Sequence, residues 1–240
     1  ARAGILVGTR SRPSRTRRRP ARTSSPASPA PAGGLLDVVL ATRNPGKVRE
    51  MLALLRDLPL RVYDLTAFPR VPDLPEEGQT YTENAISKAL TVARLTGRVA
   101  LADDSGIEIA GLGGGPGPHS RRFLGPQASD AARNARILKM LQNAPPEARR
   151  ARYRAVVAVA TPEGVVRTFE GVCEGEIAPA PRGSHGFGYD PIFLVPEFGK
   201  TMAQLPPAVK NRISHRARAI AAARPFLRML ATGRPTPSEP

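Results

Sequence analysis

The chain has 240 residues, of which 41% are hydrophobic, so it is long enough for one large domain or two small ones with a substantial core. Its single cysteine, Cys173, excludes an internal disulfide and a cluster of thiolates around zinc, as is typical of a reducing compartment. No apolar run approaches the roughly 18 residues that cross a bilayer. We therefore expect a globular cytoplasmic protein without a membrane segment.

The formal net charge of +16 is distributed unevenly along the chain. The first 36 residues hold eight arginines and no acidic residue, and the remainder is only moderately basic. A moderate excess of positive charge suits a protein that binds polyanionic small molecules, and it does not require a nucleic-acid surface.

Residues 1–34 are rich in Arg, Ser, Pro and Ala without any periodicity, which predicts a disordered extension. A transit-type peptide, a nucleic-acid-binding arm and a segment without function are the alternatives, and we favour the last. We expect the folded domain at residues 35–232, followed by a loose C-terminus at 233–240.

Order begins with a β-rich run at residues 36–41, a loop at 42–47 and a helical pattern at 48–58. Gly46 permits close backbone approach, the helix start offers free N–H groups, and Lys47 adds a charge, as in a phosphate-binding loop. An ordinary strand-to-helix turn fits the same residues equally well. The loop lacks the residues of a Walker A motif, which argues against a phosphate-loop kinase.

A strand is predicted at residues 60–63 and a helix at 80–95, where Thr80 and Glu83 have capping-box spacing and Gly97 can end the helix. From spacing alone, the polar stripe on this helix is best interpreted as a solvated face. The stripe consists of Glu83, Asn84, Ser87 and Lys88.

Two adjacent carboxylates, Asp103 and Asp104, follow an apolar run and precede a Ser-Gly pair, so we predict that they lie where a buried strand ends. Neighbouring like charges are costly unless a cation joins them, and Mg²⁺ prefers one or two carboxylates together with substrate phosphates. Taken alone, the pair is more typical of a solvated acidic turn.

The middle of the chain is expected to serve mainly as scaffold. Residues 111–120 form a glycine-rich loop, and Ser129 can cap a helix at 129–143. A hairpin is predicted from strands at 153–160 and 165–173.

Residues 186–193 place two aromatic side chains, Phe187 and Tyr189, around a glycine and directly before Asp190. The aromatic rings could stack on a planar base while the carboxylate and the backbone read its edge. In a core hairpin the same rings would simply pack.

A basic segment follows, with Lys210 and the pair His215–Arg216 near the start of a helix that runs towards residue 224. These side chains offer donors to phosphates and to a base edge, or they form an exposed basic helix face. We expect Pro225 to end or kink the helix.

Taken together and in this order, the segments resemble the inosine triphosphate pyrophosphatase family, also called the Ham1-like family, over residues 36–230. Any one motif is weak, but five in sequence are very specific. The motifs are Thr42-x-Asn44-x-x-Lys47, Glu83-Asn84-Ala85-x-x-Lys88-Ala89, Asp103-Asp104-Ser105-Gly106, Gly186-Phe187-Gly188-Tyr189-Asp190-Pro191-Ile192-Phe193, and Lys210-Asn211-Arg212-Ile213-Ser214-His215-Arg216.

The resemblance implies an α/β fold in which a long twisted mixed sheet is flanked by helices, with two lobes around a substrate cleft and usually a homodimer. It also implies Mg²⁺-dependent hydrolysis of the deaminated purine nucleoside triphosphates ITP, dITP and XTP to the monophosphate and pyrophosphate. The rival hypothesis is a nucleic-acid-binding protein that uses the basic tail and the C-terminal helix.

By the same resemblance, Asp104 would accept the proton of the attacking water and would also contact the metal ion. A second metal contact is assigned to Glu77 and not to Glu76, although the acidic loop is one residue shorter than in many members. His215 and Arg216 would donate to the 6-oxo group of the purine. The substrate-binding residues implied are Thr42, Arg43, Asn44, Pro45, Gly46, Lys47, Lys88, Ser105, Phe187, Gly188, Tyr189, Asp190, Lys210, His215 and Arg216.

Overall fold

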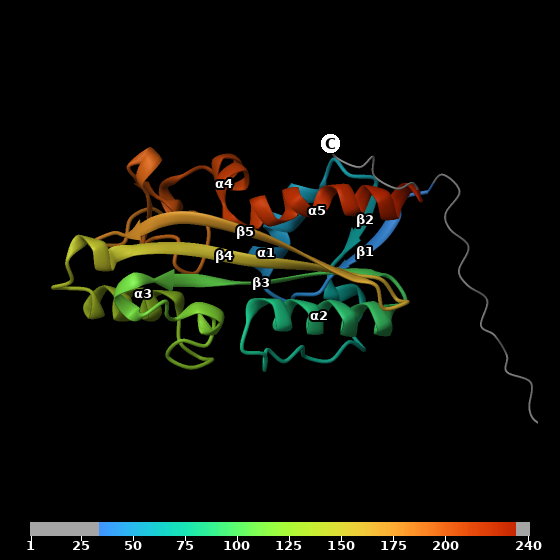
Figure 1. The fold of residues 1–240 in the computed structure, drawn as a ribbon, viewed down its shortest axis with the longest axis horizontal. Helices are drawn as coiled ribbons and strands as arrows, with labels where there is room; N and C mark the ends of the chain where they lie inside the picture. Colours follow the sequence, from blue (N-terminus) through green and yellow to red (C-terminus); the bar gives the residue numbers. More distant parts are fainter. Residues whose placement is uncertain (1–33, 234–240) are drawn as a thin grey trace, which may run out of the picture. The chain divides into compact units, whose positions relative to one another are not determined.

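The structure is a computed structural model that describes residues 34–233 (Figure 1). The extension predicted for residues 1–34 and the loose C-terminus predicted for 233–240 therefore lie outside the described residues, apart from Gly34 and Gly233.

The described part of the chain contains seven strands and five α-helices, together with short 3₁₀ helices. The α-helices and strands are β1 Leu36–Leu40, α1 Pro45–Leu55, β2 Leu60–Tyr63, α2 Tyr81–Thr96, β3 Val99–Ile109, α3 Asp130–Met140, β4 Arg150–Ala160, β5 Val166–Ile177, β6 Phe193–Val195, β7 Lys200–Thr201, α4 Pro207–Ile213 and α5 His215–Thr232. The 3₁₀ helices are η1 Leu65–Ala67, η2 Ala110–Leu112, η3 Gly117–His119, η4 Pro146–Arg149, η5 Pro196–Phe198 and η6 Met202–Gln204.

All the strands belong to one mixed sheet of order β2-β1-β3-β4-β5-β6-β7. Strand β1 pairs parallel with β2 and β3, whereas every pair from β3 to β7 is antiparallel. The predicted α/β class with a mixed central sheet is confirmed.

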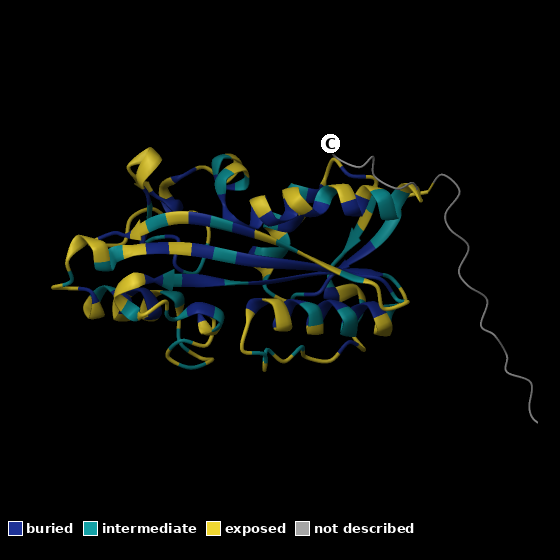
Figure 2. Cartoon of the chain, in the orientation of Figure 1, coloured by how far each residue is buried: buried dark blue, intermediate teal, exposed yellow. Residues whose placement is uncertain are grey.

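Helices cover both faces of the sheet because side chains alternate along each strand. Val99 and Leu101 of β3 pack in one core with α1 and α5, while Ala100 and Ala102 pack in another with α2. Figure 1 shows α2 and α5 on opposite sides of the central strands, and Figure 2 shows that these strands are largely buried. A third core, which includes α3, lies around the far half of β3.

Local sequence signals predicted several element ends correctly. Thr80 and Glu83 form the capping box of α2, and Gly97 ends that helix in the left-handed conformation at φ 63°. Ser129 caps α3 by accepting a hydrogen bond from the backbone N–H of Ala132. The free thiol of Cys173 is buried.

The prediction that a strand ends at Asp103 and Asp104 is wrong. Strand β3 continues to Ile109 because β4 pairs with it antiparallel over its whole second half. What ends here is the parallel neighbour, since the last β1–β3 pair joins Leu40 to Leu101. The two carboxylates therefore lie mid-strand, just beyond the carboxyl end of β1, which is where open α/β sheets bind ligands.

The structure also fixes two helix boundaries. Helix α1 begins at Pro45 and not at residue 48, because the Asn44 side chain caps it. Of the two outcomes expected at Pro225, an end of the helix is excluded, because α5 runs on to Thr232 with Phe226 and Leu227 buried in the core beneath it. Packing there offsets the hydrogen bond that proline cannot donate.

Among residues 34–233, we find no helix with the length and apolar character needed to span a membrane.

Candidate active site

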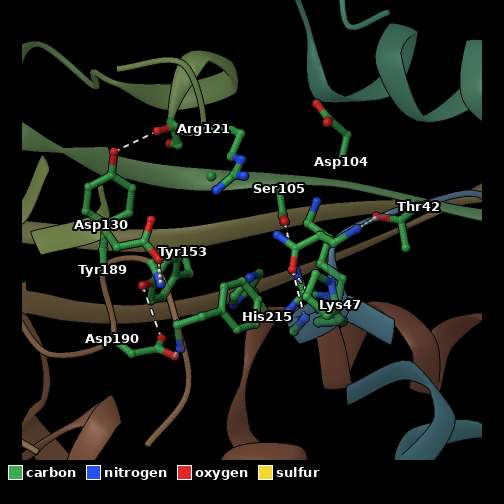
Figure 3. Close-up of a pocket in the computed structure, with 18 of the residues that line it drawn as sticks. Thr42, Lys47, Asp104, Ser105, Arg121, Asp130, Tyr153, Tyr189, Asp190 and His215 are labelled. Carbon is green, nitrogen blue, oxygen red and sulfur yellow. Dashed lines mark hydrogen bonds between the residues drawn. The ribbon is translucent and has the colours of Figure 1, made fainter. Parts of the chain in front are cut away.

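A cavity of about 570 Å³ opens beyond the carboxyl end of β1 (Figure 3). It is lined by Asp104 and by every predicted substrate-binding residue except Lys88. Lys88 is buried immediately behind, with its ammonium group 2.8 Å from the carboxylate of Asp104. Segments that are far apart in the sequence therefore converge on one cavity.

One wall of the cavity is the loop between β1 and α1. The side chain of Asn44 accepts hydrogen bonds from the backbone N–H groups of Gly46, at 2.9 Å, and Lys47, at 3.2 Å. Thr42 accepts one from the backbone of Asn44 through its hydroxyl, and Arg43 donates to the carbonyl of Val71 at 2.6 Å. The loop thus holds the positive end of the α1 dipole and the ammonium of Lys47 at the cavity.

On the α2 side of β3, the carboxylate of Asp104 is buried with 3% of its surface exposed. One of its oxygens accepts from Lys88 at 2.8 Å, and the other accepts from the amide of Asn84 at 3.2 Å. Burial raises the pKa of Asp104, and the ammonium groups of Lys88 and Lys47 only partly offset that effect. A carboxylate of this kind is a suitable proton acceptor.

The polar stripe on α2 is only partly solvated. Asn84 and Lys88 are buried against the cavity, whereas Glu83 and Ser87 are exposed. The interpretation of the whole stripe as a solvated face is therefore wrong, because β3 supplies a buried carboxylate opposite two of its members.

The acidic loop places Glu76, and not Glu77, at the cavity. Glu76 accepts from Lys88 at 2.7 Å and lines the cavity, whereas Glu77 is exposed and does not. Of the two residues, Glu76 is therefore the one whose position fits the metal contact that the resemblance implies. Burial opposes the charge of Glu76, but Lys88 and Lys47 outweigh it, so its pKa is lowered.

On the opposite face of β3, Asp103 is completely buried. One carboxylate oxygen lies 2.7 Å from the ammonium of Lys47 and 3.1 Å from the guanidinium of Arg216, and it accepts from the hydroxyl of Ser105 at 3.0 Å. Burial opposes ionisation, but Arg216 and Lys47 prevail and hold the pKa of Asp103 far below its usual range. Asp103 is thus a fixed anion that positions the cations around it.

The segment from Gly186 to Asp190 forms a tight turn on the other side of the cavity. Asp190 accepts from the backbone N–H of Phe187 at 2.9 Å and pairs with Lys210, and Tyr153 donates to it at 3.2 Å. A Cβ at Gly186 would lie 1.9 Å from the Asp190 carboxylate, and φ there is 77°, so the turn requires glycine.

The two aromatic side chains of this turn occupy different environments. Tyr189 is only 6% exposed, packs in the third core, and donates through its hydroxyl to the carbonyl of Ser120 at 2.7 Å. The Phe187 ring is half-buried and lies over Gly46, where a Cβ would approach it to 2.5 Å. Phe187 is therefore the ring that faces the phosphate-type loop.

The basic residues at the start of α5 are buried, not an exposed helix face. His215 stacks on Tyr153 with ring centroids 4.6 Å apart, and its Nδ1 has no hydrogen-bond partner within the described chain. Burial lowers the pKa of His215 well below its usual range, and the neighbouring Arg216 adds to that effect. The ring is therefore neutral and can donate from only one nitrogen.

Glu50 is a site residue that the sequence interpretation missed. Its carboxylate lies 2.8 Å from Lys210 and 2.5 Å from Arg216. Burial opposes its charge, but Arg216 and Lys210 lower its pKa. The available signal was its position three residues after Lys47 on α1, where it shares the helix face that points to the cavity.

Three further residues that support the turn were also missed. The carboxylate of Asp130 accepts from the backbone N–H of Gly188 at 2.8 Å, and the amide of Asn134 donates to the Gly188 carbonyl at 3.1 Å. Tyr153, described above, is the third. The four-residue spacing of Asp130 and Asn134 was a signal for a shared helix face, but no local pattern pointed to their partner.

The donor set at the cavity fits a hard divalent cation. Asp104 and Glu76 present carboxylate oxygens on either side of Lys88. Within residues 34–233, no group of three or more His, Cys, Asp or Glu side chains could form a closed protein cage. Two carboxylates completed by substrate phosphates are the ligand set that Mg²⁺ prefers.

Comparisons with known proteins agree with this geometry. The model of the Ham1 family matches residues 38–226. A dITP/XTP pyrophosphatase of Desulforamulus reducens is 46% identical over 195 residues, covering 81% of this chain and 97% of that protein. One of Geobacter sulfurreducens is 48% identical, covering 77% and 92%.

A solved structure of a HAM1 protein from Coxiella burnetii superposes with a TM-score of 0.73 at 45% identity, covering 80% of this chain and 98% of that one. The Ham1 protein of Staphylococcus aureus gives 0.71 at 38% identity. With the family model matching most of the chain and relatives similar over nearly their full length, this chain belongs to the Ham1 family.

Proposed function

We propose that this protein hydrolyses the deaminated purine nucleoside triphosphates ITP, dITP and XTP to the nucleoside monophosphate and pyrophosphate. The observation that carries the proposal is a single cavity that joins a phosphate-type loop, a buried carboxylate with a raised pKa, and an aromatic turn. Relatives named dITP/XTP pyrophosphatase, 46% and 48% identical, support the same activity.

The phosphate end would lie at the β1–α1 loop and β3. Lys47 and the positive end of the α1 dipole would orient the polyphosphate, with Lys88 beside the reacting group. Asp104 would take one proton from the attacking water as the oxygen bonds to phosphorus and the α–β phosphoanhydride breaks. Pyrophosphate leaves with the electron pair of that bond, so no covalent enzyme intermediate is needed.

Asp104 and Glu76 would hold Mg²⁺, which when bound neutralises phosphate charge during the transfer. Helix α2 holds the Asp104 carboxylate in orientation through the hydrogen bonds that Asn84 and Lys88 donate to it.

The base end would lie at the turn from Gly186 to Asp190. Phe187 would stack on the purine, and the neutral His215 and Arg216 would donate to its 6-oxo group. Asp190 accepts from Tyr153 and from the backbone N–H of Phe187 and pairs with Lys210, and it would hold the turn and Lys210 in place. Adenine carries an amino donor at position 6 and would leave these donors unpaired.

We further propose that residues 35–232 form the catalytic domain, and that the protein is a homodimer acting in the cytoplasm. Light scattering coupled to size-exclusion chromatography tests the oligomeric state. Nucleic acid is not required for the proposed reaction.

The direct test is an assay for pyrophosphate with ITP, XTP, GTP and ATP in the presence and absence of Mg²⁺. We expect release from ITP and XTP that depends on the metal and far exceeds release from ATP. Absence of pyrophosphate with every nucleotide, together with steeply salt-dependent DNA binding, would instead support the nucleic-acid-binding rival.

A further inference from the structure

The charged groups that form the floor of the cavity or lie directly behind it nearly balance one another. Four cations face five carboxylates, and each cation lies within 3.1 Å of at least one carboxylate. The cations are Lys47, Lys88, Lys210 and Arg216, and the carboxylates are Glu50, Glu76, Asp103, Asp104 and Asp190. A polyanionic substrate therefore needs positive charge that this floor does not hold in excess.

Some of the arginines that line the cavity have an acidic partner and others have none. Arg43 lies 3.4 Å from Asp73, and Arg133 lies 3.2 Å from Asp130. Among cavity-lining arginines of the described chain, Arg49 and Arg121 are the ones without a hydrogen bond or ion pair. Arg49 extends from α1, on the wall of the phosphate-type loop, whereas Arg121 belongs to a different wall.

The backbone that carries Arg121 is fixed beside the reacting part of β3. The hydroxyl of Ser120 accepts from the backbone N–H of Ile107 at 2.9 Å and donates to the carbonyl of Gly117 at 2.6 Å. Tyr189 holds the Ser120 carbonyl from the other side at 2.7 Å. Figure 3 shows the Arg121 side chain directed into the cavity from this segment.

We propose that Arg121 is a substrate-binding residue whose guanidinium contacts the polyphosphate from the wall opposite Lys47. A planar guanidinium fits phosphate oxygens in a bidentate manner, and Arg121 gives up no existing partner to make this contact. The inference rests on the proposed function, since it takes Asp104 and Ser105 as the place where the phosphates lie.

The chain provides a matched control one residue away. Arg122 is also exposed and carries the same charge, but it lies 3.2 Å from the ring nitrogen of His119 and does not line the cavity. Comparing Arg121→Ala with Arg122→Ala separates a contact with the substrate from a general effect of positive charge.

The test measures binding of inorganic tripolyphosphate and of IMP by calorimetry, alongside ITP turnover. We expect Arg121→Ala to weaken tripolyphosphate binding about tenfold, to change IMP binding less than about twofold, and to raise the KM for ITP about tenfold. Arg121→Lys should fall between wild type and Arg121→Ala, and Arg122→Ala should match wild type. The loss should shrink at high salt because the contact is exposed.

Each contrary outcome overturns the proposal in a distinct way. If Arg121→Ala binds tripolyphosphate as tightly as wild type, Arg121 does not contact the polyphosphate. If Arg122→Ala loses as much tripolyphosphate affinity as Arg121→Ala, the effect is one of general positive charge. A loss confined to IMP would move Arg121 to the nucleoside end. If wild-type protein binds tripolyphosphate through Arg121 but releases no pyrophosphate from ITP, the proposed function fails and the binding assignment remains.

Discussion

Asp103 and Asp104 are neighbours in the chain but lie in two chemically different regions on opposite faces of β3. Asp103, towards α1 and α5, is held by two cations, and its carboxyl pKa is lowered. Asp104, towards α2, faces one ammonium that it shares with Glu76, and burial raises its pKa. Alternation along a strand therefore places two neighbouring carboxylates in surroundings that lower the pKa of one and raise the pKa of the other.

The largest effect is expected from Asp104→Asn. Loss of the proton acceptor should lower kcat/KM for ITP by about a thousandfold, because general base catalysis is worth roughly 10² to 10⁴. The thermal midpoint should stay within a few degrees of wild type, since the amide removes a buried charge whose ionisation burial already disfavours. An Asp104→Asn protein with full ITP turnover would contradict the assignment of the base.

Asp103→Asn should act mainly on stability. Removing this carboxylate leaves Lys47 and Arg216 short of a buried partner, which costs about 3 kcal/mol in the free energy of unfolding. Denaturant unfolding measures the loss. Asp73→Asn is the control, because Asp73 is exposed beside Arg43 and its loss should cost less than about 0.5 kcal/mol. If the two variants lost the same free energy of unfolding, the structural role inferred for Asp103 would be wrong.

Two further variants, Glu76→Gln and Glu77→Gln, test which of the two acidic residues contacts the metal ion. We expect Glu76→Gln to raise the Mg²⁺ concentration for half-maximal activity by about 10- to 100-fold, because a carboxylate beside Asp104 is lost. Glu77→Gln should behave as wild type because that side chain is exposed and outside the cavity. The reverse order would restore the assignment made from the sequence.

The smallest effect concerns pH, where the two aspartates should differ in sign. The pKa of Asp103 is lowered on folding, so its stabilisation is complete above its unfolded value of about 3.9 and is lost as pH falls below it. The pKa of Asp104 is raised on folding, so its protonation stabilises the fold as pH falls through the raised value.

Unfolding free energies measured between pH 7 and pH 3 test this difference. Asp103→Asn should flatten the loss of stability in acid, and Asp104→Asn should steepen it. Slopes that change in the same direction for both variants would show that the two regions do not differ as inferred.

Much of the scaffold could be predicted from local sequence. Thr80 with Glu83 predicted the start of α2, Gly97 its end, and Ser129 the start of α3, because a cap depends on residues within one helical turn. The five motifs identified the family, and every predicted site residue except Lys88 and Glu77 lines the cavity. Sequence could identify these residues because each motif is contiguous in the chain.

Only the tertiary structure determined the surroundings of each of these residues. That β3 passes through Asp103 and Asp104 depends on pairing with β4, which lies some fifty residues later in the chain, and that pairing places the two carboxylates on opposite faces. The partners of Glu50, the choice of Glu76 over Glu77, and the free guanidinium of Arg121 likewise depend on contacts between distant elements. Sequence alone determined which chemical groups were available, because motifs are local; burial and charge pairing are long-range, so the fold determined what each group does.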